Sequence, residues 1–598
     1  AGLVKFDFLG LKTLTVLARA VQLIDRRGIP LDLSKIPLDD RTTYEMLARA
    51  ETTGVFQLES SGMRDILRRL RADRFEDIIA VVALYRPGPM DNIPSYIKRK
   101  HGEETPDFLH PSLEGTLKET FGIMIYQEQV MQIAQKLAGY TLAGADLLRR
   151  AMGKKIKAEM DAQRDTFLKG AVENGVDKAT AAHIFGLVEK FAGYGFNKSH
   201  AAAYALVAYQ TAYLKANYPV EFLAASMSLD LGNTDKLNVF RQELDRLGVP
   251  LFGPDINRSG VEFTVEHLGP DGSRDDSGAG LAIRYALSAI KNVGRGAMEA
   301  VVRERDTHGP YKDWFDFAQR LDTRIGNRRM LESLALAGAF DGLVANRRQV
   351  FEATELLLRY ANAAANERDS GQASLFDDAG GLGAPRPDLP QSEDWPALER
   401  LRHEFDAIGF YLSAHPLDAY AKGLERLGII RYAELTQGAN GHRLAGIVIA
   451  RQERSTPSGN RFAFVQLSDA SGMYEVTVFA EILAVSRQCL EPGQAVLVDV
   501  NVQRSEDGLR LTALGFQPLD DAVAHLVPGL RIFLRDSAPL PALKAVLERE
   551  GPGRGQIFLE LALADREVEM KLPQGYALGA AARAAIKAVP GVVDVHEV

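Results

Sequence analysis

The hydrophobic pattern of this chain changes its period once, and that change limits the fold. Up to about residue 437, apolar residues recur mostly at helical spacing, interrupted by turn sequences such as Arg86-Pro87-Gly88-Pro89. Beyond that point the pattern alternates, with valine at every second position from Val496 to Val502, as in strands with one buried face. A chain of 598 residues is long enough for about four domains. The sequence therefore predicts a multidomain α+β protein.

Smaller changes in pattern divide the chain into segments. In the first part we expect a helix over 11–26, further helices to about 230, short strands at 255–285 around Gly269-Pro270-Asp271-Gly272, a helical block over 285–360 and an exposed linker over 366–396. In the second part we expect a small β-barrel after 437 and an α+β tail over 528–598, with strands Arg531–Leu534 and Gln556–Leu563 and a helix near 538–550.

Composition is that of a soluble globular protein, with 46% hydrophobic and 25% charged residues. No apolar run is long enough to span a membrane, and no leader sequence indicates secretion. Cys489 is the one cysteine, which excludes an intrachain disulfide and a cysteine-rich zinc site. We therefore expect a reducing, cytoplasmic setting. The net charge of −8 does not by itself indicate nucleic-acid binding, so local basic clusters have to be considered one by one.

The N-terminal residues combine a lysine with a carboxylate. If residues 3–8 form a strand, Lys5 and Asp7 point to the same face, and Gly10 and a helix follow. This arrangement suits phosphate and metal chemistry. Two-metal phosphoryl transfer needs several carboxylates, and the sequence contains no Asp-x-Asp pair. We therefore expect an incomplete active site.

A dense basic block follows in the helical region. Four cations fall within seven residues, namely Arg149, Arg150, Lys154 and Lys155. Guanidinium forks and ammonium point charges both pair with phosphate oxygens, so this density suits a triphosphate. A solvated basic face of a helix is the alternative.

A glycine-containing segment, Phe191–His200, leads into a helix predicted over 199–217 that carries Tyr204, Tyr209 and Tyr213. Asn197 or Ser199 can cap the helix. Lys198 and His200 then lie at its positive end, where one anion contact contributes about 0.3–1 kcal/mol. An ordinary capped loop with core tyrosines is the alternative.

A third segment resembles the hairpin of a helix-hairpin-helix module. Its residues are Lys291, Asn292, Gly294, Arg295 and Gly296. A Gly-x-Gly turn can offer backbone amides to a DNA phosphate, which positions a protein without reading sequence. A plain turn between helices is equally consistent with this short pattern.

Two further segments indicate binding. Gln372, Leu375 and Phe376 lie within the expected linker and resemble the pentapeptide by which bacterial proteins bind the sliding clamp. The barrel carries four arginines and three aromatic residues on or between its strands: Arg451, Arg454, Arg461, Arg504, Phe462, Phe464 and Tyr474. OB-type barrels bind single strands with such cations and aromatic rings, although some of these rings must be core.

Six segments together carry a resemblance to one known family. They occur in the order and register of that family: Lys5–Leu11, Phe56–Ser60, Arg86–Pro89, Tyr126–Gln129, Arg149–Lys155 and Tyr194–His200. On these segments the chain closely resembles the bacterial replicative polymerases of the C family, the DNA polymerase III alpha subunits, over essentially its whole length.

The resemblance implies five parts. They are the end of the palm (1–12), a largely helical fingers domain (13–270), a helical clamp-binding domain with a helix-hairpin-helix (271–430), an OB-type β-barrel domain (431–525) and a small α+β C-terminal domain similar to those that bind the clamp-loader tau subunit (526–598). The implied reaction is template-directed attack of a primer 3′-hydroxyl on a deoxynucleoside triphosphate (dNTP), with two Mg²⁺ ions.

The resemblance also implies roles for individual residues. Asp7 matches a catalytic aspartate that holds Mg²⁺, and Lys5 matches a contact to the triphosphate. The remaining matches are the nucleotide contacts Arg149, Arg150, Lys154 and Lys155, with Lys198, Ser199 and His200 beside them, and the clamp motif Gln372, Leu375 and Phe376. The other palm aspartates are expected upstream of Ala1, so this chain alone is expected to be inactive.

The partners implied are primer–template DNA, dNTP, the sliding clamp, the tau subunit and a proofreading exonuclease subunit bound through an upstream region. No membrane partner is expected. Two other interpretations stay open: a nonenzymatic DNA- and clamp-binding module, or part of the error-prone polymerase of the same family. The clamp-like pentapeptide and the α+β tail favour the replicative member.

Overall fold

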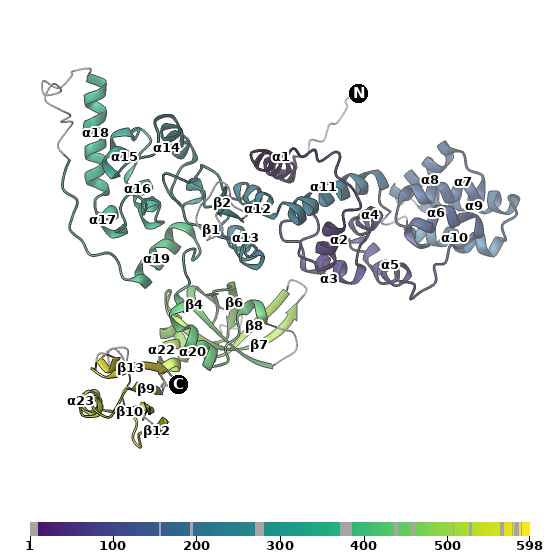
Figure 1. The fold of residues 1–598 in the computed structure, drawn as a ribbon. Coiled ribbons are helices and arrows are strands. Elements are labelled where there is room, and N and C mark those ends of the chain that lie inside the picture. Colours follow the sequence, from purple (N-terminus) through teal and green to yellow (C-terminus); the bar gives the residue numbers. More distant parts are fainter. Residues whose placement is uncertain are drawn as a thin grey trace. The chain divides into compact units, whose positions relative to one another are not determined.

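The structure, a computed structural model, describes residues 10–154, 157–191, 195–268, 280–370, 386–435, 440–455, 461–505, 508–524, 529–562, 567–576, 578, 585–587 and 589–597. The chain divides into two compact units, Ala1–Ser413 and Ala414–Val598, drawn in Figure 1. Helices, a closed barrel and a small mixed sheet make this a multidomain α+β protein, as predicted. No helix in the described ranges is long and apolar enough to cross a membrane.

The first unit begins with thirteen labelled α-helices. They are α1 (Lys12–Asp25), α2 (Arg41–Ala48), α3 (Ser61–Leu70), α4 (Phe75–Leu84), α5 (Ile93–Lys100), α6 (Glu114–Leu117), α7 (Gln127–Ala138), α8 (Leu142–Lys154), α9 (Lys157–Glu173), α10 (Lys178–Phe191), α11 (Lys198–Asn217), α12 (Pro219–Ser228) and α13 (Thr234–Leu247). The helices predicted at 11–26 and 199–217 are therefore present as α1 and α11.

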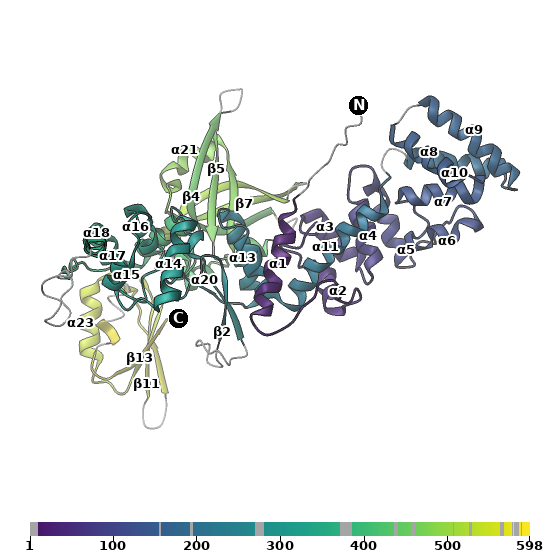
Figure 2. The ribbon, with the colours of Figure 1, turned by 90° about the horizontal axis from the view of Figure 1, so that it is seen from above.

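Helix α11 connects two hydrophobic cores of the first unit. Its alanines from Ala201 to Ala212 pack with α2–α5, whereas Leu214 belongs to the core that α1, α12 and α13 share. Alanine side chains let neighbouring helices approach closely, so α11 is covered along several faces (Figure 2). A third core, built from α6–α10 around Phe167 and Phe185, lies beyond its N-terminal end. The packing therefore fixes the start of α11 between two helical layers.

A short sheet and more helices complete the first unit. Strands β1 (Leu251–Phe252), β3 (Gly280–Arg284) and β2 (Thr264–Leu268) form a sheet in that order. The helices that follow are α14 (Arg295–His308), α15 (Trp314–Arg320), α16 (Arg328–Leu336), α17 (Arg347–Glu352), α18 (Thr354–Ser370) and α19 (Ala397–Ile408). The prediction of a linker from residue 366 was wrong at its start, because α18 continues to Ser370.

The second unit contains the predicted barrel. Strands β4 (Asn440–Ser455), β5 (Arg461–Asp469), β6 (Gly472–Val478), β8 (Gly508–Pro518) and β7 (Ala495–Ser505) close in that order. A parallel contact between Val476 and Leu511 closes the ring. Every second residue points inward, so Val496, Val498 and Val500 are fully buried. Helix α20 (Ala421–Arg426) precedes the barrel, α21 (Ala480–Ser486) lies between β6 and β7, and α22 (Leu519–Ala524) follows β8.

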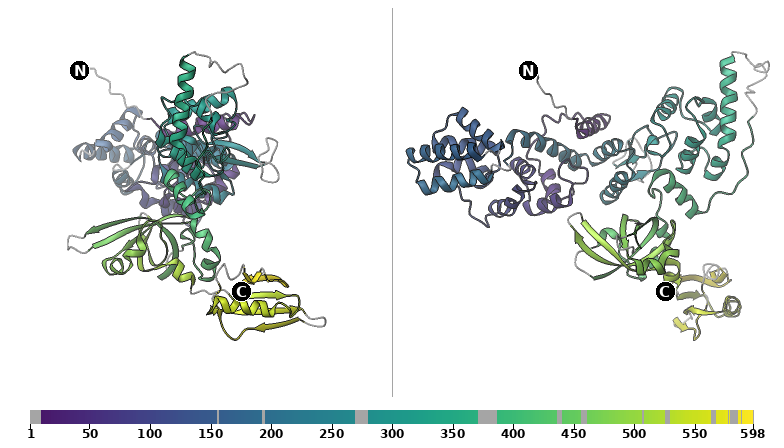
Figure 3. Two further views of the ribbon diagram at one scale, coloured as in Figure 1. Left: turned by 90° about the vertical axis from the view of Figure 1, so that its left-hand side faces the viewer. Right: turned by 180° about the vertical axis from the view of Figure 1, so that it is seen from behind.

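The chain ends in a small sheet with one helix. Its strands run in the order β12 (Glu567–Lys571), β11 (Ile557–Ala562), β9 (Leu530–Leu534) and β13 (Val592–Glu597), with β10 (Pro552–Gly555) apart from it. Helix α23 (Leu540–Glu550) lies along one face of this sheet (Figure 3). Its Leu543 and Leu547 are buried in one core with Ile532 and Ile557. The other face of the sheet carries alternating polar and aromatic side chains, as period-2 strands with one buried face require.

Candidate functional site

The sequence predicted Asn197 or Ser199 as the cap of α11, and one of these two residues holds that position. Asn197 is the cap, because its Oδ1 accepts a hydrogen bond of 2.8 Å from the backbone N–H of His200. Glu128 on α7 accepts from the backbone N–H of Lys198 at 2.9 Å and from the Asn197 side-chain amide at 2.8 Å. Ser199 and His200 are exposed beside it. A carboxylate from another helix thus fixes this helix start.

Four rings and one guanidinium lie next to one another in a row across this helix start, with His200 and Tyr204 stacked and Phe196 edge-on to His200 at 76°. The guanidinium carbon of Arg86 lies 4.0 Å from the centre of the Phe196 ring, which lies 5.4 Å from the His200 ring. His200 stacks on Tyr204 at 4.4 Å, and Tyr204 lies 5.7 Å from Phe56. We call these five residues the α11 ladder. Flat π-faces of this kind accept nucleobases.

Backbone contacts hold the ladder in place. The backbone N–H of Gln127 donates to the Phe196 carbonyl at 2.9 Å, and the Gln127 side-chain amide donates to the Gly195 carbonyl at 3.0 Å. On the opposite side, Gly88 has φ of +98°, a conformation that side chains other than glycine rarely adopt. This turn separates α4 from Pro89 and follows Arg86 directly. Motifs far apart in the sequence therefore meet at one position.

The side chain of Lys198 lies next to Glu119 and Tyr126, which each have a buried polar atom without a hydrogen-bond partner among the described residues. Its ammonium pairs with Glu119 Oε2 at 2.8 Å and lies 5.4 Å from the centre of the Tyr126 ring. Among the described residues, the other Glu119 oxygen and the Tyr126 hydroxyl are buried without a hydrogen-bond partner. Burial raises the pKa of Tyr126, so its hydroxyl remains a donor. Buried polar atoms left unpaired are rare and are consistent with a place where a ligand or water completes the bonding.

The basic block lies on α8 and is partly neutralised. Asp146 pairs with Arg149 and with Arg150, each at 2.8 Å, and the hydrogen bond from Arg149 lowers the pKa of Asp146. The Arg150 side chain is still 64% exposed. Lys154 ends α8, and its side chain is outside the described part of the chain. Among the described residues, no hydrogen bond or ion pair joins Arg149 or Arg150 to the α11 ladder.

Several predicted site residues lie outside the described residues. They are Lys5, Asp7, Lys155, Gln372, Leu375 and Phe376. Within the described ranges, no group of three or more His, Cys, Asp or Glu side chains could hold a metal ion.

The turn before α14 has the geometry expected of a backbone-presenting turn. Asn292 has φ of +64°, and α14 begins at Arg295 with Gly294 as its cap. A Cβ atom built on Gly294 or Gly296 would meet nothing within 4 Å, and neither residue has positive φ. Conformation and internal packing therefore do not require glycine here. The two glycines keep the first amides of α14 accessible to another molecule.

The two cations at this turn, Arg295 and Lys291, differ in their contacts. Arg295 pairs with Glu262 at 2.6 Å and with Glu299 at 3.0 Å, and the hydrogen bond to Glu262 raises the pKa of Arg295. The backbone N–H of Lys291 donates to the Ala407 carbonyl at 2.9 Å, and the residue is exposed. Lys291 is thus the better placed of the two for an external anion.

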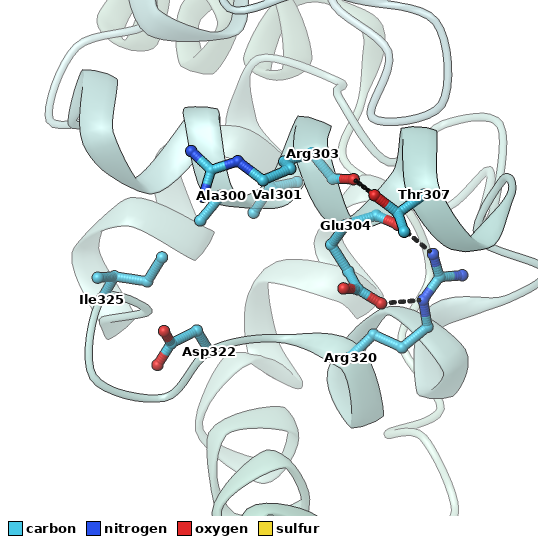
Figure 4. Close-up of a pocket in the computed structure, with 8 residues that line it drawn as sticks. All are labelled: Ala300, Val301, Arg303, Glu304, Thr307, Arg320, Asp322 and Ile325. Carbon is cyan, nitrogen blue, oxygen red and sulfur yellow. Dashed lines mark hydrogen bonds and ion pairs between the residues drawn. The ribbon is translucent and has the colours of Figure 1, made fainter.

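A pocket of 240 Å³ is lined by residues of α14, by Arg320 at the end of α15 and by Asp322 and Ile325, which follow it (Figure 4). Its charged residues are Arg303, Glu304, Arg320 and Asp322, so cations and acids are balanced. Arg320 is bonded to Glu304 at 3.1 Å through both the side chain and the backbone carbonyl. The balance of charge gives this pocket no preference for an anion.

On the barrel, the aromatic residues divide between surface and core. Phe462 and Phe464 are half-buried on the outer side of β5, with ring centres 5.4 Å apart, and the Arg454 guanidinium lies 5.5 Å from the Phe464 ring. Tyr474 is core, with 4% of its surface exposed and its hydroxyl donating to the Ala445 carbonyl. Arg451 pairs with Glu453 and Glu491, Arg461 is exposed, and the Arg504 side chain lies outside the description.

Three sequence profiles match consecutive parts of the chain. Residues 13–175 match the bacterial DNA polymerase III alpha subunit finger domain, residues 248–350 a helix-hairpin-helix motif, and residues 442–519 an OB-fold nucleic acid binding domain. The α11 ladder extends beyond the first of these matches, since three of its members follow residue 175.

Curated relatives cover the whole chain. The DNA polymerase III subunit alpha of Caulobacter vibrioides is 49% identical over 605 residues, which span 100% of this chain and 52% of that protein. The corresponding subunit of Escherichia coli K12 is 42% identical over 96% of this chain and 50% of its own length, and that of Rickettsia prowazekii 42% over 92% and 48%. The chain spans about half the length of these relatives.

Among solved structures, an OB-fold domain of replication protein A from Methanococcus maripaludis is 18% identical, covering 15% of this chain and 94% of its own with a TM-score of 0.13. At 49% and 42% identity over nearly all its residues, this chain is homologous to about half the length of the bacterial DNA polymerase III alpha subunits.

Proposed function

We propose that this chain supplies the nucleotide-binding part and the DNA-binding surfaces of a template-directed DNA polymerase. The reaction joins a primer 3′-hydroxyl to the α-phosphate of a dNTP and releases pyrophosphate. The observation that carries the proposal is the α11 ladder, in which Phe56, Arg86 and the stretch Phe196–Tyr204 meet although they are three separate parts of the sequence.

Each part of this site has a chemical task in the proposal. The ring faces stack on a base, and the cations next to the first turn of α11 meet phosphate oxygens. Lys198 must exchange Glu119 for a phosphate, since its ammonium is already paired at 2.8 Å. Arg150 on α8 is largely exposed and is available for the same anion. Positioning and charge neutralisation are the main contributions a protein makes to phosphoryl transfer.

The cofactor in the proposal is Mg²⁺, which would activate the primer hydroxyl and neutralise the leaving pyrophosphate. Asp7 is the residue of this chain assigned to hold it. The described residues do not supply a further cluster of ligands, and Glu119 is neutralised by Lys198.

In the proposal, DNA and partner proteins bind surfaces other than the α11 ladder. We assign the duplex phosphates to Lys291, Asn292, Gly294, Arg295 and Gly296 at the turn before α14, and single strands to the outer face of β5. Gln372, Leu375 and Phe376 are assigned to the sliding clamp, the C-terminal module to the tau subunit, and an upstream region to the exonuclease subunit. Chromosomal replication would place the protein in the cytoplasm.

Photo-crosslinking with an azido-substituted dATP tests the site without requiring turnover. Peptides from Arg149–Lys155 and Phe196–Tyr204 should be labelled, and excess dATP should prevent the labelling. Labelling confined to other peptides, or labelling that dATP does not suppress, would contradict the proposed site.

A second candidate function is favoured by the half-buried Phe462 and Phe464 and the exposed Arg454 on the outer side of the barrel. In this alternative the isolated chain is a nonenzymatic DNA- and clamp-binding module. It would bind DNA with a steep salt dependence and would not extend a primer in any combination.

A further inference from the structure

A second pocket, of 580 Å³, lies between α3 and α5. The residues that line it follow the family segments Phe56–Ser60 and Arg86–Pro89 in the sequence and are not part of them. Its charged and polar lining consists of Arg68, Arg69, Arg71, Lys98, His101 and Glu103. Four cations face one acid, in contrast to the balanced pocket beside α14. The excess of positive charge makes an anion the natural occupant.

The cations of this region divide into paired and unpaired groups. Arg99 and Lys100 on α5 are held by Glu104, Asp73 and Asp77. Within the described part of the chain, by contrast, the side chains of Arg68, Arg71 and Lys98 have no ion pair or hydrogen bond. The Arg69 guanidinium forms an ion pair with Asp65 at 3.0 Å. Three exposed cations, none of them in an ion pair within the described residues, therefore meet at one pocket that holds a single acid, Glu103.

A purely structural explanation covers only part of this arrangement. Cations in the last turn stabilise a helix through its dipole, and Arg68 and Lys98 occupy such positions. Arg71 does not, because it lies past the end of α3 with φ of +46°. Glycine is the usual residue in that left-handed conformation. An arginine is retained there at a conformational cost, and its side chain lines the pocket.

The pocket also offers an apolar surface. Pro94 is exposed at its side, and Ile97 is buried beneath it with 9% of its surface exposed. The His101 ring is held by a hydrogen bond of 3.0 Å between its Nε2 and the Arg69 carbonyl. An apolar surface inside a cationic rim suits a nucleotide unit, with the sugar or base on Pro94 and Ile97 and phosphates on the arginines.

We propose that the α3–α5 pocket binds one or two consecutive nucleotides of a single-stranded nucleic acid, through their phosphates. The proposal rests on the proposed function only in choosing a strand as the source of the phosphate. Free pyrophosphate presents the same chemistry, and the two sources are separable by experiment.

The test measures binding of a fluorescent oligothymidylate to the 598-residue chain by anisotropy at several salt concentrations. In the triple variant Arg68→Gln/Arg71→Gln/Lys98→Gln, we expect affinity to fall about tenfold or more. The slope of log K against log salt should become shallower by about 0.7–1.4, because each of the one or two phosphate contacts on a single strand contributes about 0.7. An iodouracil-containing oligonucleotide should crosslink to peptides of α3 and α5.

The matched control removes the same charge elsewhere. Lys35, Arg41 and Arg324 are 81%, 91% and 88% exposed and are each paired with an acid, so their triple replacement by glutamine should leave affinity and slope nearly unchanged. Equal effects in both triple variants would overturn the proposal. Loss of pyrophosphate binding with unchanged oligonucleotide binding would also overturn it, in favour of a free anion. None of these residues belongs to the α11 ladder, so failure here leaves the crosslinking test of the proposed function independent.

Discussion

The ammonium nitrogen of Lys198 lies 2.8 Å from a carboxylate oxygen of Glu119, at the first residue of α11. In the proposed function this ion pair competes with the nucleotide for the same cation. The two partners should then respond oppositely to substitution, which is a property that a structural ion pair does not have.

Replacing Lys198 by Met should raise the KM for dNTP about 10- to 100-fold, since a hydrogen bond to a charged group contributes about 1.5–3 kcal/mol. Replacing Glu119 by Gln should lower the KM or leave it unchanged, because the ammonium is released. Both variants are measured in primer extension with the missing upstream segment supplied separately. An equal increase of KM in both would indicate that the pair serves only folding.

The turn before α14 allows stability and binding to be separated. Gly296 lies in the first turn of α14, and a Cβ there would meet nothing. Gly296→Ala should therefore stabilise the helix by about 0.5–1 kcal/mol, while the added methyl weakens duplex binding about tenfold, or about 1.4 kcal/mol.

Urea unfolding and anisotropy with a labelled duplex check the two effects. Gly232→Ala is the matched control, because that glycine also has open space around it. If Gly296→Ala binds duplex DNA as tightly as the Gly232→Ala variant, the turn does not contact a phosphate.

The outer face of β5 should bind single strands by stacking. Phe464→Ala should cost about 1–3 kcal/mol of binding for each base that stacks on the ring, measured by anisotropy with oligothymidylate. Leu514→Ala removes an apolar side chain that is 53% exposed on β8 and should have no effect. Equal losses in the two variants would argue against a stacking role for Phe464.

Lys215 should give the first unit a distinctive pH dependence. Burial lowers the pKa of Lys215 to about 8 from 10.5, although its ammonium is 2.7 Å from Glu243. Between pH 8 and 10.5 the unfolded chain then binds more protons at this residue than the folded chain, so its contribution to stability rises with pH through that window and is lost as pH falls from 10.5 to 8.

Unfolding of wild type and Lys215→Met at several pH values isolates this contribution, because other titrating groups cancel in the difference. At neutral pH the variant should also lose about 3 kcal/mol, since Glu243 is left buried with one partner fewer. Parallel stability curves from pH 8 to 10.5 would contradict the assignment.

Local features of the fold were predictable from the sequence. The alternating valines of β7 predicted the barrel because strand periodicity depends only on neighbouring residues. Asn197 was one of two predicted caps. It lies three residues before His200, whose backbone N–H donates to the Asn197 side chain. The start of the linker was mispredicted because alanine, glutamate and arginine near the end of α18 favour helix, whereas the segment was judged by its later glycines and prolines.

Long-range relationships were not predictable in this way. Arg86, Phe56 and Glu119 were not assigned to a site by their own spacing, and packing of α11 against two helical layers brings them to it. The sequence also did not decide whether Tyr474 lies on the surface or in the core of the barrel. Both faces of a short barrel carry aromatic residues, so the strand register is needed to assign each ring to one face. Phe464 and Tyr474 lie on neighbouring strands, but only the latter points inward.

Primer extension tests the central claim most directly. The chain is assayed alone and with a separately produced upstream segment of the polymerase, in Mg²⁺ and four dNTPs, with Asp7 intact and as Asp7→Asn. Extension should occur only in the combined sample and should be abolished by Asp7→Asn. Extension by the chain alone, or extension in the combined sample that survives Asp7→Asn, would contradict the account.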